Sequence, residues 1–326
     1  KHFGRGKTPF VMTAYEGDDL VAVYPLFRQG SLWGAIRPMG VGPSDYLKPV
    51  AAPEVRERAW QAFLERLGEE RSLVDLHQVP GPAAPLSTQP AVAALHPGQG
   101  ETNALVQASC LIVDLPETYD AYLERLSKSL RYDVRRLDRD AKAKVRDDVD
   151  PISAMRILFD LHEKRWRSRG LPGAFLGRTR KFQEEWAQIG ARAGLLRVSI
   201  LEWDGRDVGA IYAMRMGMTT YYYQAGFDPE AGSISPGTML VAHALKGAIG
   251  EGSQRFDFCR GDEPYKRRWK PDHVVTNYRL LLGATGLGRV GEGWNRLAWS
   301  VEERIRRRLE GGRLLPRRGP HTSEQS

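Results

Sequence analysis

The residues best suited to chemistry are concentrated in one segment, Arg255–Trp269, with the sequence RFDFCRGDEPYKRRW. Its first part predicts a strand over Gln254–Cys259, so the ionisable residues that follow lie at the carboxyl end of a strand. Ligand crevices of α/β sheets form at such ends. Asp257 faces away from its two phenylalanine neighbours, and partial burial there raises the pKa of a carboxyl, as a general base requires.

The rest of this segment includes the ionisable side chains of Arg260, Asp262, Glu263, Tyr265 and Lys266. Such a density at a strand end indicates chemistry. The two carboxylates also have a structural interpretation, because acidic residues stabilise the amino terminus of the short helix predicted over Pro264–Lys270. Both interpretations stay open on the residues alone.

A second feature is the predicted strand Thr219–Phe227, which leads through a Gly/Ser loop into a helix that opens at Pro236. The first turn of a helix presents backbone N–H groups and the positive end of the helix dipole, so phosphate groups bind there. Proline suits the first helical position, and Ser235 is expected to be the N-cap. The alternative is that Ser235 simply caps a surface helix.

Other motifs carry less chemical information. The sequence GLGRVG at Gly286–Gly291 matches the dinucleotide fingerprint but lacks the strand and acidic residue that should follow, so we assign it no nucleotide. His162 and His243 have no partners at metal-ligand spacing, which favours structural roles and predicts no metal. The chain has neither a G-x-S-x-G motif nor a Walker motif, which disfavours serine catalysis and nucleotide hydrolysis.

Two stretches are strongly basic. The predicted helical stretch Arg131–Arg146 interleaves its cations with Asp133, Asp138 and Asp140, which predicts a solvated face with ion pairs between successive turns. A site for an anionic acceptor is the alternative. Beyond Trp294, many arginines share a predicted helix with apolar residues, a pattern that also suits contact with an anionic membrane.

The composition of the chain limits the class of protein to which it can belong. With 326 residues, 41% hydrophobic and 27% charged, the chain has the composition of a globular protein of about two domains. Its net charge of +8 favours an anionic partner such as nucleic acid, anionic lipid or a polyphosphate cofactor. Only two cysteines occur, far apart at Cys110 and Cys259, which excludes a disulfide framework. No apolar run is long enough to span a bilayer, so we expect a cytoplasmic protein.

The elements that must position the candidate residues follow a repeated order. The first half predicts strands at Phe10–Tyr15, Leu20–Phe27 and Leu32–Met39, a helix at Pro53–Glu69, a strand at Leu73–Val79 and a linker at Pro80–Gly100. The second half begins with a predicted strand at Ser109–Leu115 and helices at Pro116–Leu126, Ser127–Lys144, Ile152–Arg169 and Arg178–Ala193.

Strands then follow at Leu195–Trp203, Asp207–Met216 and Thr219–Phe227, with a hairpin turn at Asp204–Arg206. They are followed by a helix to Gly250, the strand and short helix already named, a strand at Val274–Leu282 and a last helix at Trp294–Leu309. Three strands before a helix occur in both halves. The fold class is therefore mixed α/β (α+β).

Four segments together carry a family resemblance: LHEKRW at Leu161–Trp166, YYQAGFDP at Tyr222–Pro229, SPGT at Ser235–Thr238, and Phe256–Trp269. They resemble the GNAT-fold acetyltransferases of the CelD type, which are associated with bacterial cellulose and exopolysaccharide biosynthesis. The resemblance covers about residues 105–282, and RGDEPYK at Arg260–Lys266 is its most specific part.

The sequence LSKSLRYDVRR at Leu126–Arg136 is also similar to the helical entry of the second domain in Fem-type peptidoglycan aminoacyl transferases. Those proteins contain two GNAT-like domains in tandem, each a mixed, mostly antiparallel sheet flanked by helices. The resemblance implies a degenerate GNAT-like domain at residues 1–100 and an acyltransferase domain at 101–288. A basic helix and disordered tail are expected at 289–326.

The resemblance implies transfer of an acetyl or other acyl group from acyl-CoA to an amine or hydroxyl of a sugar or polysaccharide precursor. The acceptor attacks the thioester directly, and no metal takes part. Backbone donors near Gln224 and Ala225 are expected to stabilise the developing oxyanion. The helix start at Ser235, Gly237 and Thr238 is expected to bind the pyrophosphate of acetyl-CoA, although its GSISPG loop differs from the family's glycine-rich pattern.

The same resemblance implies which residues transfer protons and which bind the acceptor. One of Asp257, Asp262 and Glu263 is expected to deprotonate the acceptor, and Tyr265 to protonate the departing thiolate. The residues expected to bind the acceptor are Trp166, Tyr223, Arg260 and Lys266.

Two other functions stay open. One is a Fem-type transferase that takes its acyl group from aminoacyl-tRNA and acts on a cell-wall precursor. The other is a non-catalytic GNAT-like partner of a polysaccharide synthase, bound peripherally at the inner face of the membrane through its basic carboxyl-terminal helix.

Overall fold

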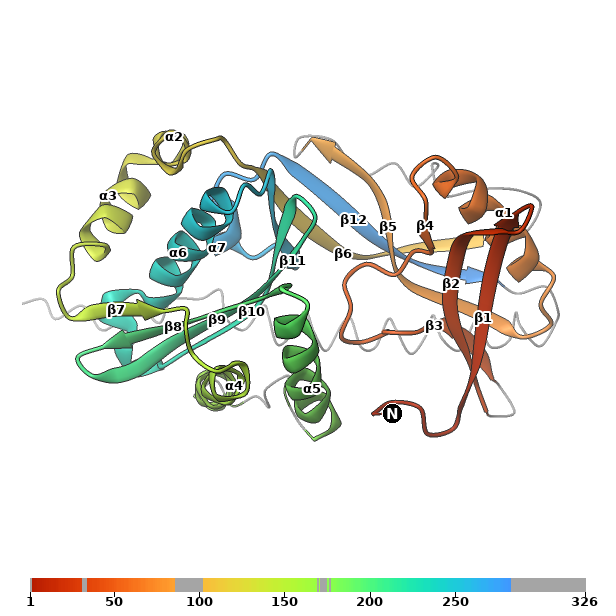
Figure 1. Cartoon of the computed structure of the whole chain (residues 1–326), viewed down its shortest axis with the longest axis horizontal. Coiled ribbons are helices and arrows are strands. Elements are labelled where there is room, and N and C mark those ends of the chain that lie inside the picture. Colours follow the sequence, from red (N-terminus) through yellow and green to blue (C-terminus); the bar gives the residue numbers. More distant parts are fainter. Residues whose placement is uncertain are drawn as a thin grey trace, which may run out of the picture.

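The computed structural model describes residues 2–30, 34–85, 102–168, 170, 175 and 177–282, and its strands join into one sheet that runs the length of the molecule (Figure 1). The strands are β1 (Lys7–Glu16), β2 (Asp19–Gln29), β3 (Ala35–Pro38), β4 (Val50–Ala51), β5 (Leu73–Pro85), β6 (Thr102–Asp114), β7 (Ala143–Arg146), β8 (Leu196–Trp203), β9 (Arg206–Met216), β10 (Thr219–Phe227), β11 (Arg255–Arg260) and β12 (His273–Leu282). The helices are α1 (Arg56–Gly68), α2 (Tyr119–Arg125), α3 (Lys128–Leu137), α4 (Pro151–Arg167), α5 (Arg178–Arg192), α6 (Pro236–Gly250) and α7 (Pro264–Arg267), with a 3-10 segment η2 at Pro229–Ile234.

The amino-terminal part confirms the predicted order of three antiparallel strands, a helix and a strand. β1 pairs with β2 and β2 with β3 in antiparallel fashion, and β5 joins in parallel beside β3. Helix α1 presents one apolar stripe, including Trp60 and Phe63, to the sheet, where both rings lie against Tyr24. The short β4, which the sequence did not predict, pairs with β2 over two residues.

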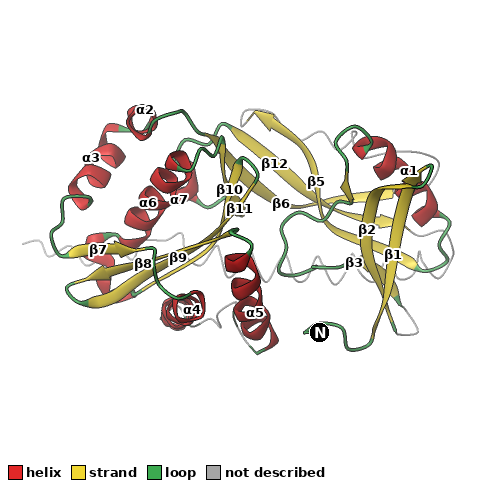
Figure 2. Ribbon diagram, in the orientation of Figure 1, coloured by secondary structure: helices red, strands yellow, loops and turns green. Residues whose placement is uncertain are grey.

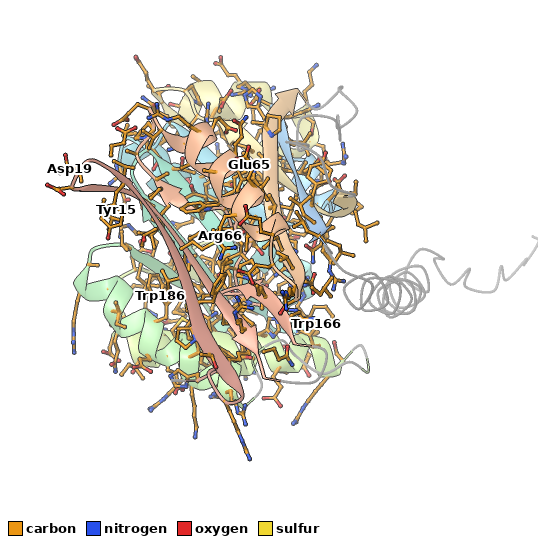
Figure 3. The ribbon with its side chains drawn as sticks, turned by 90° about the vertical axis from the view of Figure 1, so that its right-hand side faces the viewer. Tyr15, Asp19, Glu65, Arg66, Trp166 and Trp186 are labelled. Atoms are coloured by element: carbon orange, nitrogen blue, oxygen red, sulfur yellow. The ribbon has the colours of Figure 1, made fainter. Side chains whose placement is uncertain are left out.

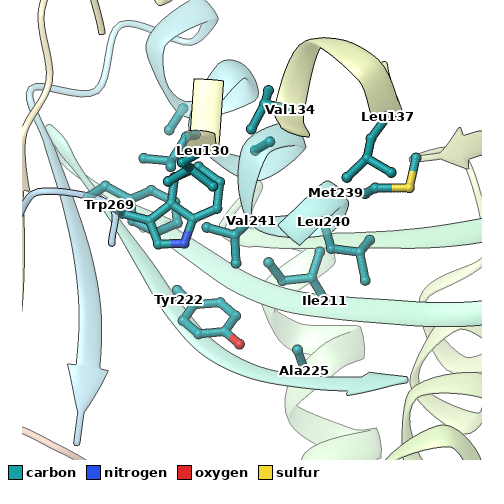
Figure 4. Packing of buried hydrophobic residues seen from close by; sticks show 14 of the residues in the cluster. Leu130, Val134, Leu137, Ile211, Tyr222, Ala225, Met239, Leu240, Val241 and Trp269 are labelled. Carbon is teal, nitrogen blue, oxygen red and sulfur yellow. The ribbon is translucent and has the colours of Figure 1, made fainter. Parts of the chain in front are cut away.

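The carboxyl-terminal part places helices on both faces of the sheet (Figure 2). On one face, α2, α3 and α6 pack on the central strands around Leu240, Leu245 and Trp269. Figure 4 shows how Leu137 of α3 meets Met239 in the first turn of α6. On the other face, α4 and α5 form a separate core with β8, β9 and β10.

Strand β12 joins the two parts. It pairs antiparallel with β5 on one side and with β6 on the other, so that His273 lies opposite both Pro85 and Ile112. Tyr278 and Leu280 of this strand complete the apolar core under α1. Because β12 pairs with both parts, the sheet itself does not divide the chain near residue 100. The domain boundary expected there stays a prediction.

Two predicted boundaries are wrong. The expected linker begins too early, because β5 continues through Pro85 by pairing with β12. The helix expected over Ser127–Lys144 ends at Leu137, and the chain then forms β7, which pairs with β8 and lets Val145 pack against the core. Strand pairing at the sheet edge outweighs the helical pattern there.

The early end of α3 also removes the expected ion pairs. Asp138 and Asp140 lie beyond the helix, and Asp133 instead faces Arg268 at 3.6 Å. Within the described part of the chain, none of the cations on the outer face of α3 pairs with a carboxylate. These cations are Lys128, Arg131, Arg135 and Arg136, and Arg139, just beyond the end of α3, lies beside them.

The GLGRVG motif and the basic helix Trp294–Leu309 lie outside the described residues. Within the described ranges, no helix combines the length and apolar character needed to cross a membrane.

Candidate active site

Strands β10 and β11 part at the centre of the sheet. They pair in parallel only where Thr219–Tyr221 runs beside Arg255–Asp257. Beyond Tyr221, β10 continues along β9 alone, and a bulge at Tyr223 shifts its register. The Ala225 N–H donates to the side-chain oxygen of Gln224 at 3.1 Å, not to a neighbouring strand. The edge of β10 that faces the gap therefore has backbone groups free of ladder pairing, as the resemblance implied.

Asp257 lies at the point where the strands part. Its side chain is 2% exposed and faces away from Phe256 and Phe258, which pack in the core under α6. Oδ2 accepts a hydrogen bond from the Tyr46 hydroxyl at 2.6 Å, and Oδ1 accepts one from the Cys259 N–H at 2.7 Å. Burial raises the pKa of Asp257 to about 6, although both hydrogen bonds oppose the shift. The expected burial and pKa direction are confirmed.

The turn after β11 is held by the side chains that follow it. Lys266 is 3% exposed and donates through Nζ to the carbonyl oxygens of Arg260 at 2.8 Å and Gly261 at 3.2 Å. Its ammonium also lies 2.9 Å from a Glu263 oxygen, and Asp262 pairs with Arg267 at 2.6 Å. These contacts indicate that Asp262, Glu263 and Lys266 stabilise the turn.

Tyr265 lies on α7 with its hydroxyl 3.5 Å from the hydroxyl of Tyr222. Burial raises the pKa of Tyr265, so its phenol stays protonated at neutral pH. Tyr222 itself stacks on Phe256 in the core under α6. Tyr265 thus approaches the gap from the face of the sheet opposite Asp257.

The loop between β3 and β4 reaches from the amino-terminal part into this site, which the sequence analysis missed. Besides the contact of Tyr46 with Asp257, Asp45 lies 3.0 Å from Nε of Arg260. Nη2 of Arg260 donates to the Gly42 carbonyl at 3.1 Å, and the Tyr223 hydroxyl donates to the Pro43 carbonyl at 2.8 Å. The available signal was the sequence GVGPSDY at 40–46, where Gly40 and Gly42 have positive φ.

A hollow of about 340 Å³ lies between this loop, β10 and α5. Its walls are Phe3, Val41, Gly42, Pro43, Asp45, Phe175, Thr179, Tyr223, Gln224 and Arg260. The structure therefore brings together three residues predicted from the sequence, Tyr223, Gln224 and Arg260. Lys266 does not line this hollow.

Trp166 does not line the hollow either. It lies on α4, on the same side of the sheet as Trp186 of α5, and donates from its indole nitrogen to Nε2 of His162 at 2.9 Å (Figure 3). Burial and the nearby Arg165 lower the pKa of His162 to about 4, so this histidine is neutral. It packs against Phe175, with ring centroids 4.8 Å apart.

The start of α6 differs in detail from expectation. Ser235 occupies the N-cap position with φ of +50°, and its side chain makes no capping hydrogen bond, because the left-handed backbone turns it away from the helix. Its carbonyl instead accepts from the N–H of Thr238 at 2.9 Å. Ser235 is therefore the N-cap residue, as predicted, but its side chain does not cap the helix.

A cation missed by the sequence analysis lies near this helix start. The guanidinium of Arg165 lies 4.2 Å from the centre of the Phe227 ring, which also borders Gly237. Its Nε is buried and has no hydrogen-bond partner within the described part of the chain. Positive charge and a helix amino terminus thus occur together at the end of β10.

Comparison with known families decides the nature of this fold. Residues 124–267, from the end of α2 through α7, match the family described as the acetyltransferase (GNAT) domain. This stretch is similar to a GNAT domain. The matched stretch contains the parted strands, Asp257 and the start of α6, and the predicted mixed α/β fold is confirmed. The arrangement as two GNAT-like domains in tandem stays a prediction.

Solved structures show the same fold at low sequence identity. FemX is 10% identical with a TM-score of 0.62, over 88% of this chain and 90% of that chain. L-PGS from Bacillus licheniformis is 14% identical with a TM-score of 0.55, over 91% of this chain and 90% of that chain. No curated protein matches the sequence significantly. The CelD type is not among these matches and stays a prediction.

Proposed function

We propose that the protein is an acyl-CoA-dependent acetyltransferase in which an amine or hydroxyl of the acceptor attacks the thioester directly. The parting of β10 and β11 beside the 340 Å³ hollow supports this proposal most strongly. In this proposal the donor binds on the α6 side of the gap between the strands, and the acceptor binds in the hollow. The predicted sugar acceptor is one candidate for the hollow.

The donor side fits an acyl-CoA. When bound, acyl-CoA supplies an acyl carbonyl activated by sulfur. The Gly237 and Thr238 backbone at the start of α6, with Arg165 beside it, provides positive potential for the pyrophosphate. The Ala225 N–H faces the gap and is available to the thioester oxygen once the Gln224 side chain releases it.

The proton path begins at Asp257. Both of its oxygens are occupied in a buried site, so the carboxylate acts on the acceptor through Tyr46. The Tyr46 hydroxyl accepts the proton of the attacking group while it passes its own proton to Asp257. On the other face, the protonated Tyr265 donates to the departing sulfur. Asp45 and Arg260 orient the acceptor in the hollow.

Calorimetric titration with acetyl-CoA tests the donor site. We expect micromolar binding that is lost in Gly237→Pro, because proline removes a backbone N–H while it suits the first helical turn. Gly237→Ala is the matched control, because it keeps the backbone N–H and its Cβ would meet only the Phe227 ring at 3.7 Å. Absence of acetyl-CoA binding, or equal binding by wild type and Gly237→Pro, contradicts the proposed donor site.

A second candidate is transfer from aminoacyl-tRNA. The observation that favours it is the outer face of α3 and the residue just beyond its end, where five cations around the exposed Tyr132 have no carboxylate partner within the described part of the chain. Phosphate backbones bind such surfaces with steep salt dependence. Salt-sensitive binding of tRNA, together with no binding of acetyl-CoA, selects this candidate over acetyl transfer.

A further inference from the structure

An apolar groove of about 590 Å³ lies between the amino-terminal strands and α5. Its walls include Phe27, Met39, Phe182, Trp186 and Ile189. The charged residues on its border are already engaged: Lys7 lies 4.3 Å from the centre of the Phe27 ring, and His2 is paired with Glu185. The groove therefore offers a ligand mainly apolar surface, at a volume typical of small-molecule sites.

The groove is continuous with the hollow of the candidate active site. Phe3, Val41 and Pro43 line both, so one ligand can extend from the groove to the gap between β10 and β11. The two ends differ in chemistry. The hollow ends at the ion pair of Asp45 and Arg260, in which Oδ1 of Asp45 lies 3.0 Å from Nε of Arg260.

These observations identify an acceptor with two unlike ends. We propose that the acceptor is an amphiphile whose amine or hydroxyl lies in the hollow beside the Asp45–Arg260 pair and whose alkyl or aryl tail fills the groove. This inference rests on the proposed function for the direction of transfer, but not for the binding of the acceptor.

A sugar acceptor fits the groove poorly. Its hydroxyl groups would face Phe182, Trp186 and Ile189, where they lose water and gain no hydrogen-bond partners. A tail of methylene groups gains from the same surface, because burial of apolar area is favourable. In the reaction the amine nitrogen or hydroxyl oxygen bonds to the acyl carbon, the carbon–sulfur bond breaks, and the proton of that atom leaves through Tyr46 as the sulfur takes one from Tyr265.

The test is binding and acetylation of butylamine, hexylamine, octylamine and glucosamine. Each probe is titrated by calorimetry, and release of free thiol from acetyl-CoA is followed in parallel. We expect affinity to rise about fourfold for each added methylene, and octylamine to exceed glucosamine in kcat/KM by at least two orders of magnitude.

Ile189→Asp places a charge in the groove, and Met216→Asp is its matched control, because both side chains are 53% exposed and Met216 lies outside the groove. We expect the chain-length effect to disappear in Ile189→Asp and to persist in Met216→Asp. Phe182→Ala, which removes apolar surface without adding charge, is expected to weaken octylamine binding at least fivefold.

Affinity independent of chain length, or better turnover of glucosamine than of octylamine, overturns the inference. Thiol release with all amines but no chain-length effect leaves the proposed acetyl transfer intact and overturns only the amphiphilic acceptor. The chain-length effect in binding without any thiol release supports the groove and contradicts acetyl transfer.

Discussion

Removal of the Tyr46 hydroxyl should shift the pH dependence of catalysis upward. This hydroxyl donates to the buried Asp257 at 2.6 Å and is the strongest of the groups that oppose the raised pKa of about 6. A hydrogen bond to a charged group contributes about 1.5–3 kcal/mol, and one pKa unit corresponds to about 1.4 kcal/mol. Tyr46→Phe should therefore raise the pKa of Asp257 by about 1–2 units.

The assay is the pH profile of kcat/KM for thiol release, whose acid limb reports the base of the free enzyme. The wild-type limb should lie near pH 6 and the Tyr46→Phe limb about 1–2 units higher, with lower kcat because the relay is lost. Tyr24→Phe is the control, since the Tyr24 hydroxyl holds the same loop at the Leu47 carbonyl without contact to Asp257. An acid limb that stays in place, or moves to lower pH, refutes the relay.

Three further predictions concern stability. Gly226→Ala should destabilise the fold by about 1–3 kcal/mol or more in urea unfolding, since a Cβ would lie 2.6 Å from the backbone nitrogen of His162. Arg279→Met should cost about 3–5 kcal/mol in the same assay, because it removes two hydrogen bonds from the fully buried Asp75. His162 is neutral in the fold, with its pKa lowered from 6.5 to about 4. Its contribution to the free energy of unfolding is therefore fully present above pH 6.5 and is lost as the pH falls toward 4. Thermal unfolding at a series of pH values measures this loss.

Each of these stability predictions has a control variant in the same protein. Gly237→Ala should cost little, because its Cβ would meet only the Phe227 ring at 3.7 Å. Arg255→Met should cost under about 1 kcal/mol, because its pair with Asp114 is exposed. His162→Gln should flatten the acid dependence between pH 4 and 6.5. A cost of Gly226→Ala equal to that of Gly237→Ala, or of Arg279→Met equal to that of Arg255→Met, contradicts the packing or the burial assigned here.

The order of elements was predictable because their patterns are local. Alternating apolar residues and turn signals located β10 to the residue and placed the Asp204–Gly205 turn between β8 and β9. The predictions went wrong where pairing partners lie far away in sequence. Pro80–Pro85 reads as a linker, yet it pairs with β12 almost two hundred residues later.

The position and burial of Asp257 on β11 were predictable from the sequence, but the contacts that distant parts of the chain make with the site were not. Asp257 could be placed because its neighbours set the face it occupies, and its burial followed from that. The contacts of Asp45 and Tyr46 join positions more than two hundred residues apart, so no local pattern predicts them. The same holds for Arg165, whose place over Phe227 depends on how α4 packs on β10.

The most direct test of acetyl transfer is release of free thiol from acetyl-CoA in the presence of a primary amine, compared between wild type and Asp257→Asn. We expect turnover by the wild type, with the acetylated amine formed in equal amount, and a loss of at least a hundredfold in the folded variant. Equal turnover by both proteins contradicts the role of Asp257, and no thiol release by the wild type with any amine contradicts acetyl transfer itself.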